Sequence, residues 1–247
     1  MKTRVLSPPA VAPRRIGGLP LRRLVRDISS VLIISGLLLV ADAVMTLVWQ
    51  EPVTAVIALV QRSQINKQYL SFQTAPLTPV ERHAVVTLPH PQQRIAYLAR
   101  REEHQVSTGD AIGRITILKI GASYDVVQGT DEASLEKGPG HYPDTAFPGL
   151  GQTVAIAGHR TTYLAPFRHL DALGPGDRIV LKMPYGLFTY SVQYRQIVPP
   201  TALWVTRNVG YERLVLSACN PLYSAAQRII IFARLQSVKP RGPATHA

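Results

Sequence analysis

An apolar run of about 22 residues, Ile28 to Trp49, constrains this chain more than any other feature. Its only charged residue is Asp42, to which we assign no function. An α-helix rises about 1.5 Å per residue, so a helix of this length is roughly 30 Å long and matches the hydrocarbon core of a bilayer. Residues 28–49 are therefore predicted to form a transmembrane helix.

The segment before this run is basic. Residues 1–27 are rich in proline and glycine, and their only acid is Asp27; the cations are Lys2, Arg4, Arg14, Arg15, Arg22, Arg23 and Arg26. Such a segment is predicted to be a disordered cytoplasmic tail, which places the chain after Trp49 outside the cell. A cleaved signal peptide is the alternative, but the run is longer than the usual 7 to 15 residues and lacks an A-x-A site. We favour an uncleaved signal anchor in the cell membrane.

The formal charge of +12 does not indicate a nucleic-acid partner. Much of the excess lies in residues 1–27, and no nucleic-acid motif occurs in the sequence. The domain that follows is expected outside the cytoplasm. Anionic lipid beside the tail is the simpler partner for this charge.

Residues 50–108 are predicted to be an extracytoplasmic stalk or linker. Helical spacing of apolar residues in 51–73 favours a stalk helix, prolines interrupt residues 76–91, and 94–104 is a candidate short helix. The region also contains His83, His90 and His104, without cysteine or acidic companions at ligand spacing. We therefore expect no metal site and no cofactor.

Residues 109–237 are predicted to form a catalytic domain built mainly of β-structure. Seven or eight short strands separated by glycine and proline favour a closed or nearly closed β-barrel. The predicted strands are 111–120, 124–127, 152–157, 178–183, 187–197, 214–218 and 229–235, with a short helix at 165–173. Residues 238–247 are predicted to be a basic C-terminal tail.

Three residues at strand ends carry candidate chemistry. Cys219, the only cysteine, follows one predicted strand, His159 follows another, and Arg228 opens a third. An acyl-transfer enzyme needs a thiol, an imidazole that handles protons, and a donor to the oxyanion. A lone cysteine is also commonly a small buried hydrophobe. His141 and His169 are lesser candidates for the imidazole.

The spacing of these three residues resembles that of the sortases, the membrane-anchored cysteine transpeptidases of Gram-positive bacteria. Their signature is T-L-x-T-C, with an arginine about nine residues later and a histidine some sixty residues earlier. This chain has V-L-S-A-C, with Arg228 nine positions after Cys219 and His159 sixty before it. The motifs A-G-H-R-T-T-Y and C-N-P look most like class E, with class D second. The resemblance covers roughly residues 110–235.

The resemblance implies an eight-stranded sortase barrel and a thiol-dependent reaction. Cys219 would attack a peptide bond in an LPXTG-like or LAXTG-like sorting signal, His159 would protonate the departing amine, and Arg228 would donate to the oxyanion. An amine of a peptidoglycan precursor would then resolve the thioester, which anchors the secreted protein to the cell wall. A pilus-type sortase, which joins protein subunits, is a variant of this interpretation. The segment 136–150 would form one wall of the peptide groove.

Three other interpretations remain. In a papain-like protease the histidine lies far downstream of the cysteine, and only His246 follows Cys219. An L,D-transpeptidase has histidine almost adjacent to its cysteine, whereas Ser217 and Ala218 precede this one. The last is a membrane-tethered β-barrel binding module whose catalytic site has decayed. Val215 and Ala218 give it some support, because the signature has threonine at both positions.

Overall fold

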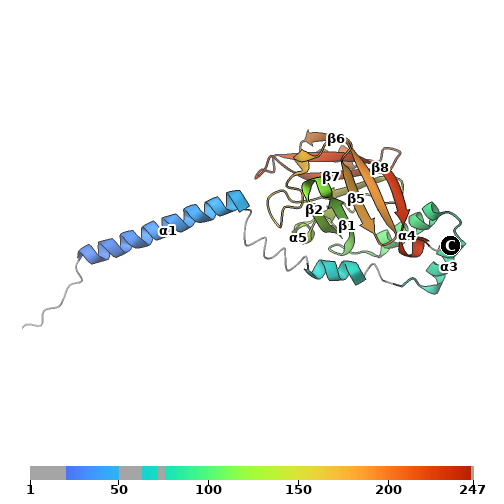
Figure 1. Ribbon diagram of the computed structural model, residues 1–247, viewed down its shortest axis with the longest axis horizontal. Helices are drawn as coiled ribbons and strands as arrows, with labels where there is room; N and C mark the ends of the chain where they lie inside the picture. Colours follow the sequence, from blue (N-terminus) through green and yellow to red (C-terminus); the bar gives the residue numbers. More distant parts are fainter. Residues whose placement is uncertain (1–20, 50–62, 72–75, 246–247) are drawn as a thin grey trace, which may run out of the picture. The chain divides into compact units, whose positions relative to one another are not determined.

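The structure is a computed structural model that describes residues 21–49, 63–71 and 76–245 (Figure 1). The chain divides into two compact units, residues 1–48 and 49–247, and each is described by itself. The predicted tail lies mostly outside the described residues, as do residues 50–62 of the predicted stalk.

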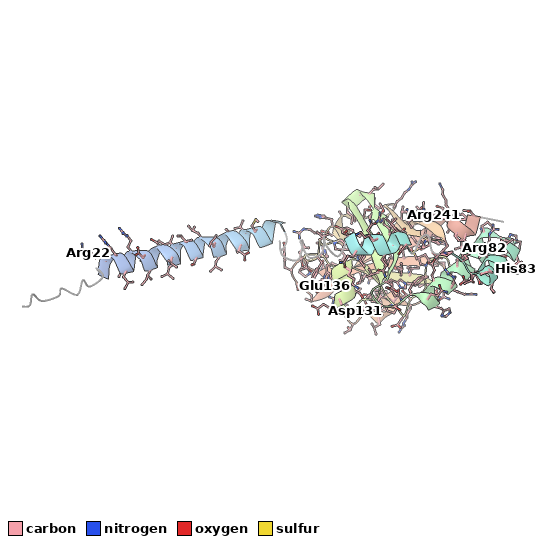
Figure 2. The ribbon with its side chains drawn as sticks, turned by 90° about the horizontal axis from the view of Figure 1, so that it is seen from below. Arg22, Arg82, His83, Asp131, Glu136 and Arg241 are labelled. Carbon is pink, nitrogen blue, oxygen red and sulfur yellow. The ribbon has the colours of Figure 1, made fainter. Side chains whose placement is uncertain are left out.

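The first unit consists of the helix α1, Leu21–Trp49. Within it, residues 22–45 form a 24-residue span with a mean hydropathy of 2.2 and no buried residues. The helix begins seven residues before the predicted start at Ile28, so Arg22, Arg23 and Arg26 belong to its first turns. Figure 2 shows Arg22 at the start of this helix. Its length and composition suit a membrane crossing, although a signal sequence has the same properties.

The second unit contains a closed eight-stranded barrel, as predicted. The strand order around it is β1-β2-β3-β4-β7-β8-β6-β5. The pairs β2/β3 and β4/β7 are parallel, and the other neighbours are antiparallel. The strands are β1 Ala111–Ile117, β2 Ala122–Gln128, β3 Gly140–His141, β4 Thr153–Ala157, β5 Arg178–Met183, β6 Gly186–Val198, β7 Arg213–Asn220 and β8 Gln227–Pro240.

Three details of the predicted elements differ from the structure. The strand predicted at 111–120 ends at Ile117, and a 3₁₀ turn, Leu118–Ile120, follows it. The strand β3 has only two residues and lies in a glycine- and proline-rich segment that was predicted to be a loop. The predicted helix at 165–173 is a series of turns that ends in a 3₁₀ turn, Leu170–Ala172. The helix α5, Glu132–Lys137, precedes β3, and its N-cap is Asp131.

Alternation along the strands sorts side chains between the barrel interior and its outer face. In β7, Leu214, Leu216 and Ala218 belong to the main core, whereas Val215 belongs to a second apolar cluster. In β8, Ile229 and Ile231 face the same core. Successive residues of a strand point to opposite faces, so the second cluster lies on the outside of the barrel.

The described part of the predicted stalk or linker, residues 63–71 and 76–108, is folded onto the barrel. The helices α3, Pro79–Thr87, and α4, Pro91–Gln105, contribute Val85, Ile95, Leu98 and Ala99 to the barrel core. Residues 63–71 are also helical, and Ile65 and Tyr69 pack against Ala111 and Val127. The folded unit therefore begins well before the predicted boundary at residue 109. The apolar faces of these short helices are buried against the barrel.

The predicted basic tail at 238–247 is also part of the fold as far as the structure describes it. The strand β8 continues to Pro240, and a 3₁₀ turn follows at Gly242–Thr245. Ala244 is fully buried in the barrel core. This last turn contacts α4, and Figure 1 shows the C-terminal end beside that helix.

Glu102 on α4 is a buried acid with an unmatched carboxylate oxygen. Its side chain is 4% exposed, and Oε2 has no hydrogen-bond partner among the described residues. Burial raises its pKa to about 8, an effect that the nearby Arg101 opposes. Below the unfolded pKa both states are protonated. As the pH rises toward 8 only the unfolded state loses its proton, so this group makes the fold progressively less stable.

We therefore expect Glu102→Gln to stabilise the protein at alkaline pH but not near pH 4. The expected gain at pH 8 is on the order of 2–4 kcal/mol, because glutamine removes the ionisation that the buried site disfavours. Urea unfolding of the detergent-solubilised chain across this pH range measures it. Glu103→Gln, at the adjacent and less buried position, is the matched control. Parallel pH profiles for the wild type and Glu102→Gln would contradict the assignment.

Candidate active site

The strand register brings Cys219, His159 and Arg228 to one end of three adjacent strands. Cys219 on β7 is directly opposite Arg228 on β8. On the other side, Ala157 of β4 pairs with Ser217, and the Gly158 N–H extends this pairing by donating to the Ser217 carbonyl at 3.0 Å. His159 and Cys219 each lie two residues beyond a member of the Ala157–Ser217 pair. Neighbouring strands are about 4.8 Å apart, so Cys219 and Arg228 lie close together, and His159 is in the loop that follows the end of β4 beside them.

Strand alternation places Cys219 and Arg228 on the outer face of the barrel. Cys219 is an even number of residues from Val215 along β7, and Arg228 is an even number from Phe232 along β8, so each faces the same side as that residue. Val215 and Phe232 both belong to the second apolar cluster, on the outside of the barrel, which we call the outer cluster. That cluster comprises Ala155, Val198, Ala202, Val205, Val215, Ile230 and Phe232, with Tyr142 packed against it. The candidate site therefore lies at the end of an apolar outer surface.

The segment between β6 and β7 borders this surface. Its 3₁₀ turn, Leu203–Thr206, buries Val205 in the outer cluster and leaves Leu203 79% exposed. Trp204 stacks on Phe232, with the ring centroids 6.3 Å apart. Exposed apolar side chains on the face that carries Cys219 suit an extended peptide with apolar residues.

Arg160 ties the end of β7 to the loop that carries His159. Its buried guanidinium donates to the Cys219 carbonyl at 3.4 Å and to the Asn220 side-chain oxygen at 3.0 Å. It also donates to the Arg168 carbonyl through two nitrogens and to Asp171 at 3.0 Å. Sequence reasoning assigned this residue no role, although it lies in the A-G-H-R motif. A buried arginine with this many partners fixes the separation of the two segments.

His159 is partly buried, and one nitrogen of its imidazole, Nε2, is both buried and without a hydrogen-bond partner among the described residues. Burial lowers the pKa of His159, and the carboxylates of Glu136 and Glu132 oppose that effect. The ring lies 5.2 Å from the ring of Tyr163, measured between centroids.

Glu136 and Tyr163 form an arm beside this histidine. The Tyr163 hydroxyl donates to Glu136 Oε1 at 2.7 Å, and Glu136 lies in α5. Figure 2 shows Glu136 and Asp131, the α5 N-cap, at the end of the unit far from Arg82 and His83 of α3. Local sequence patterns do not predict this contact, because its two residues are 27 positions apart, one in the short helix α5 and the other in an irregular loop.

The backbone that presents Tyr163 is strained. Tyr163, Leu164 and Ala165 have φ angles of 49°, 64° and 41°, a region that L-residues occupy at a cost of about 1–3 kcal/mol each. Surrounding bonds hold the segment: the Tyr124 hydroxyl donates to the Leu164 carbonyl, and the Phe167 N–H donates to the His159 carbonyl. Strain of this kind occurs mostly where position matters for function.

Arg228 is held by the turn that precedes it. Its Nη1 donates to the carbonyls of Ala225 and Gln227, both at 3.0 Å. A guanidinium has five N–H donors in a planar fork, so these two bonds leave capacity for a substrate oxygen.

The other two candidate histidines lie apart from this group. His141 is buried, with Nδ1 2.9 Å from Gln128 Oε1 and Nε2 3.1 Å from the Ala146 carbonyl. Burial lowers its pKa to about 4, so it is a neutral structural residue. His169 is exposed and precedes the 3₁₀ turn at Leu170–Ala172.

The two departures from the family signature have different surroundings. Ala218 faces the barrel core, on the side opposite Cys219, so a threonine hydroxyl there would not face the site. Val215 is fully buried in the outer cluster, four residues before Cys219. Neither residue removes a group that points at the thiol.

Comparisons with known proteins match this part of the chain to one family. The sortase domain model covers residues 115–236. Sortase D of Bacillus subtilis is 37% identical over 132 residues, which are 51% of this chain and 65% of that protein. SrtE1 of Streptomyces coelicolor is 26% identical over 160 residues, which are 58% of this chain and 45% of that protein. The chain therefore spans less than two thirds of the length of either relative.

Solved structures show the same fold. Sortase E from Streptomyces avermitilis is 32% identical with a TM-score of 0.50, over 55% of this chain and 93% of its own. SrtF from Corynebacterium diphtheriae is 26% identical with a TM-score of 0.52, over 55% and 89%. Sortase E1 of Streptomyces coelicolor, solved with a tripeptide in its active site, is 24% identical with a TM-score of 0.52, over 53% and 91%, and supports the fold alone.

We expect Glu136→Gln to lower the pKa of His159, because it removes the negative charge that opposes the effect of burial. A smaller fraction of the imidazole would then be protonated at neutral pH. NMR titration of the histidine side chains measures this, with the His159 signal assigned from His159→Gln.

Glu132→Gln should lower the same pKa less, since Glu132 makes the smaller contribution. Tyr163→Phe keeps the aromatic ring but removes the hydroxyl that donates to Glu136 Oε1. Glu103→Gln, on α4, is the control and should leave the titration unchanged. An unchanged His159 titration in Glu136→Gln would show that the arm does not act on the histidine.

Proposed function

Because residues 115–236 form a sortase domain, this chain belongs to the sortase family, and we propose that it is a membrane-anchored cysteine transpeptidase. One observation carries this proposal: Cys219 pairs with Arg228 across β7 and β8, and β4, which pairs with the other side of β7, ends two residues before His159. A thiol, an imidazole and a guanidinium at neighbouring strand ends fit acyl transfer.

In the proposed reaction Cys219 attacks as a thiolate at the carbonyl carbon of a peptide bond. The new C–S bond yields a tetrahedral oxyanion, to which Arg228 donates hydrogen bonds. Arg228 cannot be the base, since its guanidinium stays protonated. As the C–N bond breaks, imidazolium His159 gives its proton to the departing amine. The resulting thioester is attacked by a second amine, whose proton returns to His159, and the thiolate is released.

The arm of Glu136 and Tyr163 supports the proton-transfer step. Burial alone favours neutral imidazole, which cannot protonate a leaving amine. Two nearby carboxylates oppose this preference without reversing it, and the Tyr163 ring lies beside the imidazole. In this proposal Glu136 and Tyr163 are positioning residues, because they act through His159.

The proposed substrates are secreted proteins with a C-terminal sorting signal of the LPXTG or LAXTG kind, and the proposed acceptor is an amine of a peptidoglycan precursor. The apolar outer cluster beside Cys219 supports an extended peptide with an apolar first residue. A decayed binding module receives no support, because the thiol, the imidazole and the guanidinium are all retained at one strand end.

We further propose that the N-terminus is cytoplasmic and that the barrel lies outside the cell. The basic residues before α1 support this orientation through the positive-inside rule. Protease added to intact protoplasts should therefore degrade the barrel and leave the N-terminal segment protected. Protection of the barrel would contradict the orientation, and a free barrel in the medium would indicate cleavage.

Substitutions at the three strand-end residues test the proposed reaction. Cys219→Ala should abolish cleavage and transfer, because no thioester can form. His159→Ala should lower kcat/KM by about 10²- to 10⁴-fold or more, since it removes the proton donor. Arg228→Lys keeps the charge but loses the planar fork, and should cost about 10²-fold. A quenched sorting-signal peptide, assayed with and without an amine acceptor, measures all three.

His169→Ala is the matched control and should stay within a few-fold of the parent. His141 is unsuitable for this purpose, because its replacement leaves buried hydrogen-bonding groups unpaired and destabilises the fold. Full activity in Arg228→Lys would contradict the role given to that residue. Activity retained in Cys219→Ala would contradict the proposed function as a whole.

A further inference from the structure

The adjacent strands β5, β6 and β8 carry cations and no acid. Figure 1 shows these strands side by side in the barrel, in the order β8-β6-β5. Residues 178–183, 186–198 and 227–240 contain no aspartate or glutamate. The same strands contain Arg178, Lys182, Arg195, Arg228, Arg234 and Lys239.

The register arranges four of these cations as the corners of a rectangle, which we call the cationic face. One row across the strands is Arg178, Ser191 and Arg234, and another is Lys182, Leu187 and Lys239. Two strand spacings separate the cations within a row by about 10 Å, and four residues along a strand separate the rows by about 13 Å. Positions 178 and 182 alternate with the buried Ile179 and Leu181, so these rows lie on the outside.

A cavity of about 440 Å³ lies in this face. Its lining includes Arg178 and Lys239, together with the neutral polar side chains of Thr189, Ser191, Gln236 and Ser237. The row between the two cationic rows is Val180, Thr189 and Ser237. Hydroxyl and amide donors therefore lie between opposing positive charges.

The charge of the cationic face is not neutralised within the described part of the chain. None of its four corner cations has an ion pair there. Asp177, next to Arg178, already pairs with Lys119 at 2.7 Å. Burial and the neighbouring cations Arg241 and Arg114 lower the pKa of Lys182, with Asp125 opposing them. A bound anion would relieve this repulsion.

We propose that the cationic face binds an anionic polymer whose negative groups are phosphates, such as a phosphodiester chain. Cations 10 to 13 Å apart, as the strand spacings give, are too widely separated for one phosphate and suit several along a chain. The hydroxyls and amide between them can donate to phosphate oxygens.

Two other anionic partners fit this face less well. The three rows hold no aromatic side chain, and the Tyr211 ring next to Arg234 already stacks with that guanidinium, which lies 4.7 Å from the ring centroid. The bases of a nucleic acid would therefore find little stacking surface. The apolar members of the rows, Val180 and Leu187, are only partly exposed and offer little surface for insertion into a bilayer. The face is also separate from the candidate active site, since Arg234 lies six residues, or about 20 Å, along β8 from Arg228. This proposal therefore does not depend on the proposed function.

Fluorescence anisotropy with labelled inorganic polyphosphate tests the proposal on the full chain in neutral detergent. The face variant replaces Arg178, Lys182, Arg234 and Lys239 with glutamine. The matched variant replaces Lys2, Arg4, Arg14 and Arg15 with glutamine, which removes the same charge from the N-terminal segment. We expect the face variant to bind polyphosphate about tenfold or more weakly. We also expect the slope of log affinity against log salt concentration to be shallower by roughly 3. An equal loss in both variants, or none in the face variant, would overturn the proposal.

The same substitution, glutamine to glutamate, at two positions tests whether polyphosphate binds at the cavity itself. Gln236→Glu adds a negative charge to the cavity and should weaken polyphosphate binding several-fold, whereas Gln93→Glu on the exposed side of α4 should not. Both residues are exposed, so neither change should affect folding. Equal effects of the two would assign the binding to overall charge and overturn the site.

Two competitors test the ligand chemistry. Polyglutamate of equal charge should displace polyphosphate poorly, and so should monomeric dihexanoyl phosphatidylglycerol at equal phosphate concentration. Equal displacement by polyglutamate would overturn the assignment of the ligand to a phosphate polymer. Equal displacement by the lipid would overturn it in favour of a membrane lipid headgroup.

Discussion

The parallel pairing of β4 with β7 is the constraint on which the candidate site depends. It sets the end of β4 level with the end of β7, and the antiparallel pairing of β7 with β8 then adds Arg228. A shift of one residue in either pairing would turn a member of the group toward the core. Such a shift would also expose Leu214, Leu216 or Ile231, which are fully buried, so the packing that closes the barrel also fixes the register of the site.

Sequence patterns predicted the features that depend on local periodicity. The strands that hold Cys219, His159 and Arg228 are short β-branched or aliphatic runs bounded by glycine, proline or polar residues, and β4 was predicted almost to the residue. The apolar α1 was predicted for the same reason, apart from its earlier start. The spacing of three reactive residues, together with the family resemblance, then indicated which strand ends meet.

Features that depend on tertiary packing could not be predicted in this way. The short helices α3 and α4 contain many polar residues, and this composition suggested a spacer. Only contact with the barrel shows that Ile95 and Leu98 complete its core. Similarly, β3 is too short to have a period. The partners of Arg160 and Glu136 are distant in sequence or lie in irregular loops, where propensity carries no information about side-chain contacts.

Electrostatics separates the proposed reaction centre from the rest of the barrel surface. Near His159, two acids on α5 oppose the effect of burial on the pKa of the imidazole. On β5, β6 and β8 acids are absent, and the cations there remain without ion pairs among the described residues. Strand β8 takes part in both regions, because Arg228 is near its start and Arg234 and Lys239 are near its end. One rigid strand thus links a site for acyl transfer to a face suited to an anionic polymer, and each can change in sequence without disturbing the register that the other requires.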